Sequence, residues 1–256
     1  MNVEILPVAA ALALGEARCA AGVAQTEIYF WQADAAAVAV GLAQNAAREV
    51  VGENLRADGV RLYRRQSGGG AVLLGAGILC FEILTPVVAG GNAPGISESF
   101  QTLLAPVGAA AAKICGQKVM MSGVSDLTLP DGGAGKKFCG TAQLRKRSAI
   151  LVHGALLAAA DLALLSRYLR YPSVAPDYRA GRAHGDFCVT LSTVAGRQLP
   201  VGEVAAALAA EARQLNWRVA PPRSSPPLLA AAEKLRQEKY DNENWNWRRE
   251  RAMPLQ

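Results

Sequence analysis

The segment best suited to chemistry is residues 64–72, which read RRQSGGGAV. Its three consecutive glycines, 68–70, lack a Cβ atom, so their backbone N–H groups can approach a phosphate or an extended ligand closely. Arg64 and Arg65 add planar, positively charged donors that suit phosphate oxygens. The segment therefore predicts an anion-binding turn, although neither G-x-x-x-x-G-K-[ST] nor G-x-G-x-x-G is present. A flexible hairpin turn with solvated arginines is the alternative.

A second segment with chemical potential is residues 136–143, KKFCGTAQ, followed by HGALL at 153–157. Side chains alternate along a strand, so one of Lys136 and Lys137 can point inward while the other faces solvent. A lysine aimed into a phosphate-binding cleft would stabilise charge on an α-phosphate and on a carboxylate oxygen during adenylation. Two solvated lysines are the alternative interpretation.

Hydrophobic periodicity predicts the elements that position these segments. Strands are expected at residues 27–31, 37–41, 60–64, 71–74, 78–84, 118–121, 126–129, 136–144 and 148–157. Helices are expected at 5–14, 48–58, 97–115, 162–169, 201–215 and 228–240. Pro106 should break the third of these helices, because proline lacks the backbone donor. A polar tail with Trp245, Trp247, Arg248, Arg249 and Arg251 follows the last helix.

Length and composition favour one α/β body with appendages, because 256 residues can bury a full-sized core. Apolar residues make up 51% of the chain and charged residues 19%. No apolar run reaches the roughly 20 residues of a membrane span. The apolar residues 5–14 follow Glu4 and no basic residue, unlike a signal peptide. We therefore expect a cytoplasmic protein that does not insert into a membrane.

Cysteines and charge narrow the function classes further. The five cysteines, at 19, 80, 115, 139 and 188, contain no C-x-x-C pair, which argues against a disulfide framework and a zinc site. The net charge of +6 favours an acidic partner. No nucleic-acid motif accompanies it, so we expect an acidic protein and no nucleic acid.

The two chemical segments, in this order, resemble motifs of the lipoate-protein ligase and octanoyltransferase family. Its glycine motif, R-R-x-S-G-G-G-A-V, is matched at 64–72 without departure. Its lysine motif, K-[IV]-[SG]-G-[SN]-A followed by H-H-G-T-L-L, is similar to KFCGTA at 137–142 and VHGALL at 152–157. Further similar pieces are FW at 30–31, VGLAQN at 40–45, SDL at 125–127, EKY at 238–240 and NWN at 244–246.

The resemblance implies a fold and a domain organisation. The expected fold is α/β (α+β), a mixed β-sheet with flanking helices, related to the catalytic domains of biotin ligases and class II aminoacyl-tRNA synthetases. Residues 1–220 would form the catalytic domain. Residues 221–256 would form a proline-containing connection, a terminal helix and a basic tail, without a separate accessory domain.

The resemblance also implies a two-step reaction. Lipoate and ATP, with Mg²⁺, give enzyme-bound lipoyl-AMP, and a lysine of an acidic lipoyl carrier domain then attacks it to form an amide. Lys137 is the implied catalytic and ligand-contacting lysine. The implied ligand contacts are Arg65, Ser67, Gly68, Gly69, Gly70, Ala71, Val72 and Leu73. Asp126 and His153 are candidates for shaping or polarising the pocket, and a His153 satisfied by a backbone carbonyl is the alternative.

Departures from the family pattern leave a transferase as an alternative. Many of these ligases carry a C-terminal accessory domain, and this sequence ends soon after Trp245. We therefore expect a compact ligase or a separate accessory subunit. A transferase would instead take octanoyl from an acyl carrier through a cysteine thioester, without ATP, and Cys139 is its candidate nucleophile. Strand alternation puts Cys139 on the side of Lys137 only if no bulge intervenes.

Two other classes stay open. The chain could be a non-catalytic subunit that binds an acyl-adenylate or a lipoyl domain, although the retained Lys137 and the complete glycine motif speak against it. A biotin ligase would carry G-R-G-R-x-G-R, where this chain has RRQS at 64–67.

Overall fold

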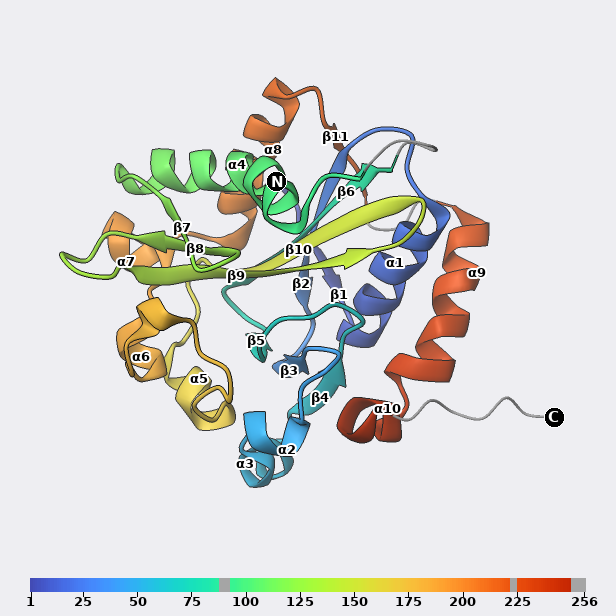
Figure 1. The fold of residues 1–256 in the computed structure, drawn as a ribbon, viewed down its shortest axis with the longest axis horizontal. Helices are drawn as coiled ribbons and strands as arrows, with labels where there is room; N and C mark the ends of the chain where they lie inside the picture. The colour runs from blue at the N-terminus through green and yellow to red at the C-terminus, as the bar shows by residue number, and fades with distance from the viewer. Residues whose placement is uncertain (88–92, 222–224, 250–256) are drawn as a thin grey trace.

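The computed structural model describes residues 1–87, 93–221 and 225–249, and its framework is one large mixed β-sheet (Figure 1). In spatial order the strands are β1 (Glu4–Leu6), β2 (Glu27–Ala33), β6 (Ile78–Pro86), β10 (Ala149–Leu157), β9 (Lys136–Arg145), β8 (Asp126–Leu129) and β7 (Met120–Ser122), and β11 (Arg218–Val219) also pairs with β2. β1 and β11 run parallel to β2, and the other neighbours are antiparallel. The expected mixed sheet with flanking helices is confirmed.

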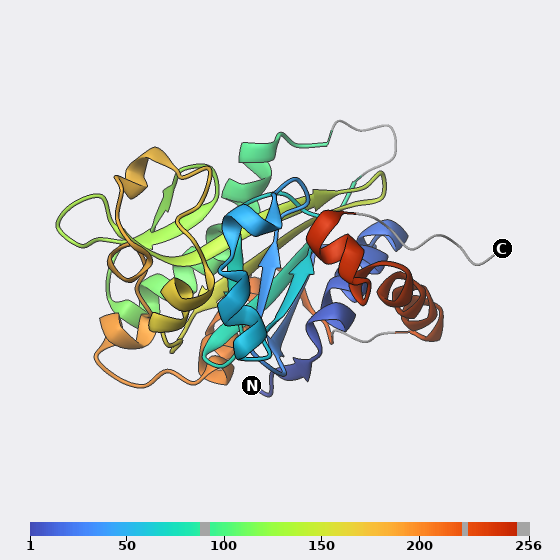
Figure 2. The same cartoon turned by 90° about the horizontal axis from the view of Figure 1, so that it is seen from below.

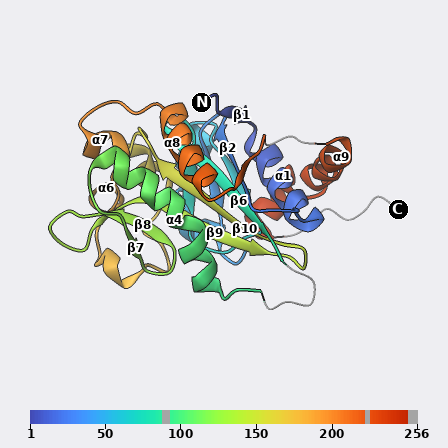
Figure 3. The ribbon, with the colours of Figure 1, turned by 90° about the horizontal axis from the view of Figure 1, so that it is seen from above.

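One face of this sheet is covered by α4 (Ile96–Cys115) and α8 (Val201–Gln214), which pack against each other (Figure 3). The short α7 (Leu191–Ala195) packs against α4. The side chains of α4 and α8 that face the sheet form an apolar core with residues such as Phe81, Phe138 and Val152. Within the described residues, none of the helices is long and apolar enough to cross a membrane.

The other face carries α1 (Val8–Ala21) and a small sheet in the order β4 (Arg61–Arg64), β3 (Ala37–Val40), β5 (Val72–Leu74) (Figure 2). α1 contacts β9 and β10 on one side and α9 (Pro226–Leu235) on the other. A helix enclosed in this way is apolar on nearly every side, as its alanine- and leucine-rich sequence requires. The small sheet and the large sheet share this second core.

Short helical segments complete the fold. They are α2 (Ala46–Glu49), α3 (Gly52–Ala57), α5 (Ala163–Tyr168), the 3-10 turn η1 (Asp177–Arg179), α6 (His184–Phe187), the π-helical turn η2 (Arg236–Tyr240) and α10 (Glu243–Arg248). η2 packs against α1, and α10 packs against β4. The end of the described chain therefore returns to the N-terminal half of the molecule.

Two predicted helices differ from the structure near the start of the chain. The helix expected at 5–14 begins only at Val8, because residues 4–6 pair with β2 and Pro7 separates the strand from the helix. The helix expected at 48–58 is divided into α2 and α3, because Val50 forms a β-bridge with Leu169. Contacts distant in sequence override the local helical pattern in both cases.

The predicted break at Pro106 is wrong. α4 continues through Pro106 from Ile96 to Cys115. Proline removes one helical hydrogen bond, but Pro106 is buried and its neighbour Val107 packs in the core formed with the sheet and α8, and this burial offsets the loss.

The polar tail contains a short helix, α10, in which Trp245 is only 3% exposed while Arg248 and Arg249 are exposed. Arg251 lies outside the described residues.

Candidate active site

The glycine-rich segment connects β4 to β5 without forming a hairpin. β3 lies between β4 and β5 in the small sheet, so the two flanking strands are not neighbours. Both Arg64 and Arg65 are buried. The alternative of a hairpin turn with solvated arginines is therefore wrong.

The Arg65 guanidinium lies beneath this loop and holds its backbone. It donates to the carbonyl oxygens of Gly68 and Gly70, both at 2.7 Å, and to that of Ala39 at 3.0 Å. Burial lowers the pKa of Arg65 to about 10, which leaves the group charged at neutral pH. A Cβ atom added to Gly68 or Gly70 would stand in open space. Arg65 thus places a positive charge under a loop in which Gly68 and Gly70 are open to ligand.

Arg64 has a different, structural role. Its guanidinium donates to the carbonyl oxygens of Gly41, Leu42, Gln44, Trp245 and Trp247 at 2.7–3.2 Å. These bonds join the small sheet to α10. The expectation that both arginines offer donors to a phosphate is wrong, because the donors of Arg64 are used on the backbone. Those of Arg65 are used on the carbonyl oxygens of Ala39, Gly68 and Gly70 and on Ser67, so Arg65 contributes its charge.

Lys137 faces the loop from β9 and has an anchored counter-ion. Its Nζ lies 2.8 Å from Oδ1 of Asp126 on β8, and the Tyr178 hydroxyl donates to Oδ2 of Asp126 at 2.7 Å. The side chains of Lys137 and Asp126 are 24% and 17% exposed, so the pair is open to ligand. A Cβ on Gly140 would lie 3.0 Å from Cε and Nζ of Lys137, so glycine leaves this lysine its room.

Cys139 lies on a different side of β9 from Lys137. Lys137 pairs with Thr128 and Cys139 with Leu127, so β9 contains one extra residue, a bulge, at Phe138. Cys139 is fully buried in the core beneath α4 and α8. Burial raises the pKa of its thiol, which is the opposite of what a thiolate nucleophile requires. The bulge therefore removes Cys139 from the side on which Lys137 acts.

His153 on β10 contacts the loop through Ser67. Its Nε2 lies 2.7 Å from Oγ of Ser67, which also accepts a hydrogen bond from Nε of Arg65 at 3.1 Å. Burial and the positive charge of Arg65 lower the pKa of His153 to about 3, so the imidazole is neutral at physiological pH. Its partner is a hydroxyl and not the backbone carbonyl that was considered from sequence.

A cavity of about 730 Å³ joins these parts, a size that suits a small-molecule ligand. Of the predicted site residues, it is lined by Arg65, Ser67, Gly68, Gly69, Gly70, Ala71, Val72, Asp126, Lys137 and His153. Leu73 does not line it. On β5 this residue pairs with Val38 and packs into the core, because adjacent strand residues point to opposite faces.

Glu82 is a cavity residue that the sequence interpretation missed. It lies in the middle of β6, is 4% exposed and accepts a hydrogen bond from the Tyr29 hydroxyl. Burial raises the pKa of Glu82 to about 7. A Cβ on Gly15 of α1 would collide with its carboxylate, so glycine allows this close approach. The available signal was one acidic residue inside an apolar run.

The rim of the cavity and a part of its wall were also missed. Residues 172–176 line the cavity, and Val174 is 86% exposed there. Glu16 of α1 and Tyr240 of η2 line it as well. No pattern indicated Glu16, and Tyr240 was noted only as part of the similar piece EKY at 238–240, without a place in the site. Across the described part of the chain, no group of three or more His, Cys, Asp or Glu residues is arranged to hold a metal.

Comparison with known proteins identifies the class to which this fold and cavity belong. A model of the lipoyl protein ligase A/B catalytic domain matches residues 7–213. This match spans most of the chain. The protein belongs to the lipoyl protein ligase A/B catalytic domain family.

Two curated relatives are similar over part of their length. The probable lipoate-protein ligase A of Mycoplasma pneumoniae is 34% identical over 142 residues, which are 56% of this chain and 39% of the relative. The protein of the same description from Mycoplasma genitalium is 33% identical over 142 residues, with the same coverage. The matched stretch thus spans about two fifths of these relatives.

Solved structures share the fold. A chain described as a bi-partite lipoate protein ligase and its E2 lipoyl domain from Thermoplasma acidophilum superposes with a TM-score of 0.80 at 23% identity and covers 100% of both chains. A putative lipoate protein ligase from T. acidophilum with bound lipoic acid gives 0.78 at 22%, over 96% of this chain and 99% of that one. A lipoate-protein ligase A bound with ATP gives 0.76 at 23%, with the same coverage.

Proposed function

We propose that this protein is a lipoate-protein ligase that activates lipoate with ATP to lipoyl-AMP and transfers the lipoyl group to a lysine of a lipoyl carrier domain. The observation that carries the proposal is the placement of Lys137 in one cavity with the glycine-rich loop. The cavity thus joins a cation to a loop of exposed backbone. This combination suits an anhydride between a carboxylate and a phosphate.

Lys137 is the residue on which the chemistry would depend. When the lipoate carboxylate attacks the α-phosphate, negative charge grows on the phosphate oxygens and diphosphate leaves. The Lys137 ammonium would stabilise that charge, and Asp126 keeps the ammonium oriented. His153 and Ser67 would hold the glycine-rich loop beside Lys137, and His153 adds no positive charge because its imidazole is neutral. In the second step Lys137 would stabilise the adenylate leaving group while the carrier lysine attacks the acyl carbon.

The apolar part of the cavity lining suits an acyl chain. It is formed by apolar side chains from α1, β2, β9 and β10, among them Leu12, Trp31, Leu144 and Leu151. Burying each methylene of an eight-carbon chain there would contribute about 0.8 kcal/mol. Lipoate and octanoate share this chain length, so we propose both as acyl substrates.

We propose that ATP binds at the glycine-rich loop and that any magnesium ion is held by the ATP phosphates. The nucleotide supplies the α-phosphate, and we propose the backbone of glycines 68–70 as its contact, with the positive charge of Arg65 beneath that backbone. Magnesium would enter with the phosphates of ATP, since no cluster of metal-ligating side chains exists among the described residues. No step is assigned to it.

A cysteine-dependent transferase is less well supported. Cys139 lies in the opposite core, and Cys80, which borders the cavity, has a thiol whose pKa is raised by burial. A thioester needs a thiolate in contact with the acyl carbon. The retained Lys137–Asp126 pair also favours an enzyme over a non-catalytic binding subunit.

The proposed protein partner is an acidic lipoyl domain. The net charge of +6 favours its approach, and the T. acidophilum neighbour is described together with its E2 lipoyl domain. That neighbour is also described as bi-partite, which supports a separate accessory subunit for this chain. We place the reaction in the cytoplasm, where the five free thiols would persist.

Mass spectrometry of an apo lipoyl domain tests the proposal. The domain is incubated with the protein and either lipoate plus Mg-ATP or octanoyl-carrier protein without ATP. A lipoyl mass increase in the first mixture alone is expected. An octanoyl increase in the second mixture alone would replace the ligase by a transferase.

A further inference from the structure

The glycine-rich loop needs support from outside its own sequence. Glycine loses more backbone freedom on ordering than any other residue, so three in succession make an ordered loop costly. Arg65 holds this loop from beneath, at Gly68 and Gly70. The residue at the start of the loop, Gln66, is half-buried and is held by a different group.

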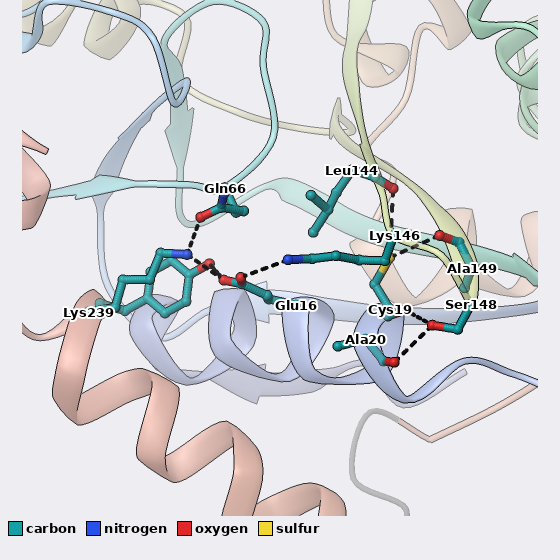
Figure 4. Close-up of polar contacts among 10 residues, drawn as sticks. Glu16, Cys19, Ala20, Gln66, Leu144, Lys146, Ser148, Ala149 and Lys239 are labelled. Atoms are coloured by element: carbon teal, nitrogen blue, oxygen red, sulfur yellow. Dashed lines mark hydrogen bonds and ion pairs between the residues drawn. The ribbon is translucent and has the colours of Figure 1, made fainter. Parts of the chain in front are cut away.

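That group is Lys239, on the π-helical turn η2 (Figure 4). The Lys239 ammonium is 2% exposed and donates to Oε1 of Gln66 and, at 2.6 Å, to Oε2 of Glu16 on α1. The Tyr240 hydroxyl donates to the same Glu16 oxygen at 2.6 Å, and Nζ of Lys146 lies 3.4 Å from Oε1. Gln66, Glu16 and Tyr240 all line the cavity, so this network forms part of its wall.

The network places one carboxylate, that of Glu16, between two lysines, Lys239 and Lys146. Burial opposes ionisation of Glu16, but hydrogen bonds from Lys239 and Tyr240 and the charges of both lysines hold its pKa below the ordinary value. α1 is itself fixed, because the Ser148 hydroxyl caps the carbonyl oxygens of Cys19 and Ala20 at its end (Figure 4). Glu16 is thus a rigid anchor for the lysine that holds Gln66.

A second pair of contacts ties the same segment to the strand before the loop. The Arg64 N–H donates to Oδ1 of Asn246 at 2.9 Å, and the Trp245 indole N–H donates to the Arg64 carbonyl at 2.9 Å. β4 is an edge strand of the small sheet, and α10 occupies its open edge. Two positions at the entry to the loop, 64 and 66, are therefore fixed by residues between 239 and 246.

Simple helix packing does not require this arrangement. A buried lysine is costly unless it is paired, so an apolar residue would attach η2 to α1 more cheaply. The lysine instead uses its donors on two elements at once, α1 and the loop.

We propose that Lys239 is a positioning residue of the active site, which fixes Gln66 against Glu16 and so holds the glycine-rich loop in the shape that receives the ligand. The segment from Arg236 to Arg248 would then help to position the glycine-rich loop of the active site. This inference rests on the proposed function only for its effect on substrate, because the loop itself can be observed without any substrate.

The test compares full-length variants by hydrogen–deuterium exchange of residues 66–70 and by steady-state kinetics. Lys239→Met removes the donors at similar length, and Gln66→Met removes only the acceptor on the loop while Lys239–Glu16 stays intact. Lys239→Arg keeps the charge and donors. Lys234→Met, an exposed lysine of α9 paired with Glu238, is the matched control.

Both methionine variants should exchange faster at 66–70 than the wild type, and KM for ATP or lipoate should rise about 10-fold, the effect of one lost hydrogen bond. Lys239→Arg should restore part of this, and Lys234→Met should match the wild type. Wild-type exchange and KM in Gln66→Met would overturn the proposal, even if Lys239→Met lowers the melting temperature. If the wild-type protein makes no product, the proposed function fails, and loop exchange alone still decides the role of Lys239.

Discussion

The Lys137 ammonium and the Asp126 carboxylate form a 2.8 Å ion pair between the neighbouring strands β9 and β8, at the wall of the cavity. A partly exposed pair contributes little to stability. Its value lies in orientation, because Tyr178 holds the carboxylate and the carboxylate holds the lysine. An anionic ligand therefore meets a cation that is already in place.

Replacing Lys137 by methionine should reduce the rate of lipoyl transfer by at least about 100-fold, since a donor aimed at developing charge is lost. Mass spectrometry of the carrier domain measures this rate. Lys136→Met is the control, because Lys136 is next to it on β9 and does not line the cavity. Equal rates for the two variants would contradict the assignment.

Alanine at Gly140 should lower kcat/KM about 10-fold with little change in melting temperature. The added methyl would crowd the flexible end of Lys137, which can move away at small cost to the fold. Gly108→Ala is the control. Gly108 lies in α4, and its new methyl would meet Val119 at 3.6 Å, an ordinary van der Waals distance, so this variant should retain full activity. Unchanged kinetics in Gly140→Ala would show that Lys137 can act from another position.

The Cys139→Ala variant should retain ligase turnover close to that of the wild type. Its side chain contacts the core beneath α4 and α8 and not the cavity. Intact-mass analysis with octanoyl-carrier protein should also find no acyl group on Cys139. A stable acyl adduct there, or complete loss of transfer, would restore the transferase hypothesis.

Glu82 should make stability fall as pH rises. Its pKa is about 7 in the folded protein and 4.5 when unperturbed, so the folded state binds the extra proton between these values. The contribution is fully present below about pH 4.5 and is lost as pH rises through about 7, a change of about 3 kcal/mol.

Urea unfolding at several pH values measures this change. Glu82→Gln should gain stability relative to the wild type as pH increases, while the exposed Glu53→Gln should follow the wild-type profile. A constant difference between Glu82→Gln and the wild type would show that Glu82 does not titrate there. His153 affects the free energy of unfolding at lower pH. Its pKa is lowered in the folded protein, so the unfolded state binds a proton first and stability falls as pH drops from 6.5 toward 3.

Much of the chemistry could be predicted from short stretches of sequence. Residues 64–72 and Lys137 indicated an anion-binding loop and a cation, and alternation along β9 separated Lys137 from Lys136. The strands around them were predicted because an apolar repeat of two residues is a local property of a sheet with buried faces. The roles of Arg64 and Cys139 were not predictable in this way.

Those roles depend on partners distant in the chain. One extra residue in β9, visible only once β8 is paired beside it, turns Cys139 into the opposite core. Arg64 reads as a phosphate contact until α10 packs on β4 and takes its hydrogen bonds. Pro106 suggests a helix end until α4 packs its apolar side chains, among them Val107, against α8 and the sheet.

The sequence by itself determined the types and the spacing of the candidate ligand-binding residues in two segments, because motif spacing and side-chain periodicity are carried by neighbouring residues. Only the tertiary structure decided which charges are free to act and which are used to hold the fold. Lys239 and Lys137 are both lysines beside a carboxylate, yet the first is 2% exposed and the second 24%. That difference follows from long-range packing, which sets both the burial of a charge and the partners that compensate for it.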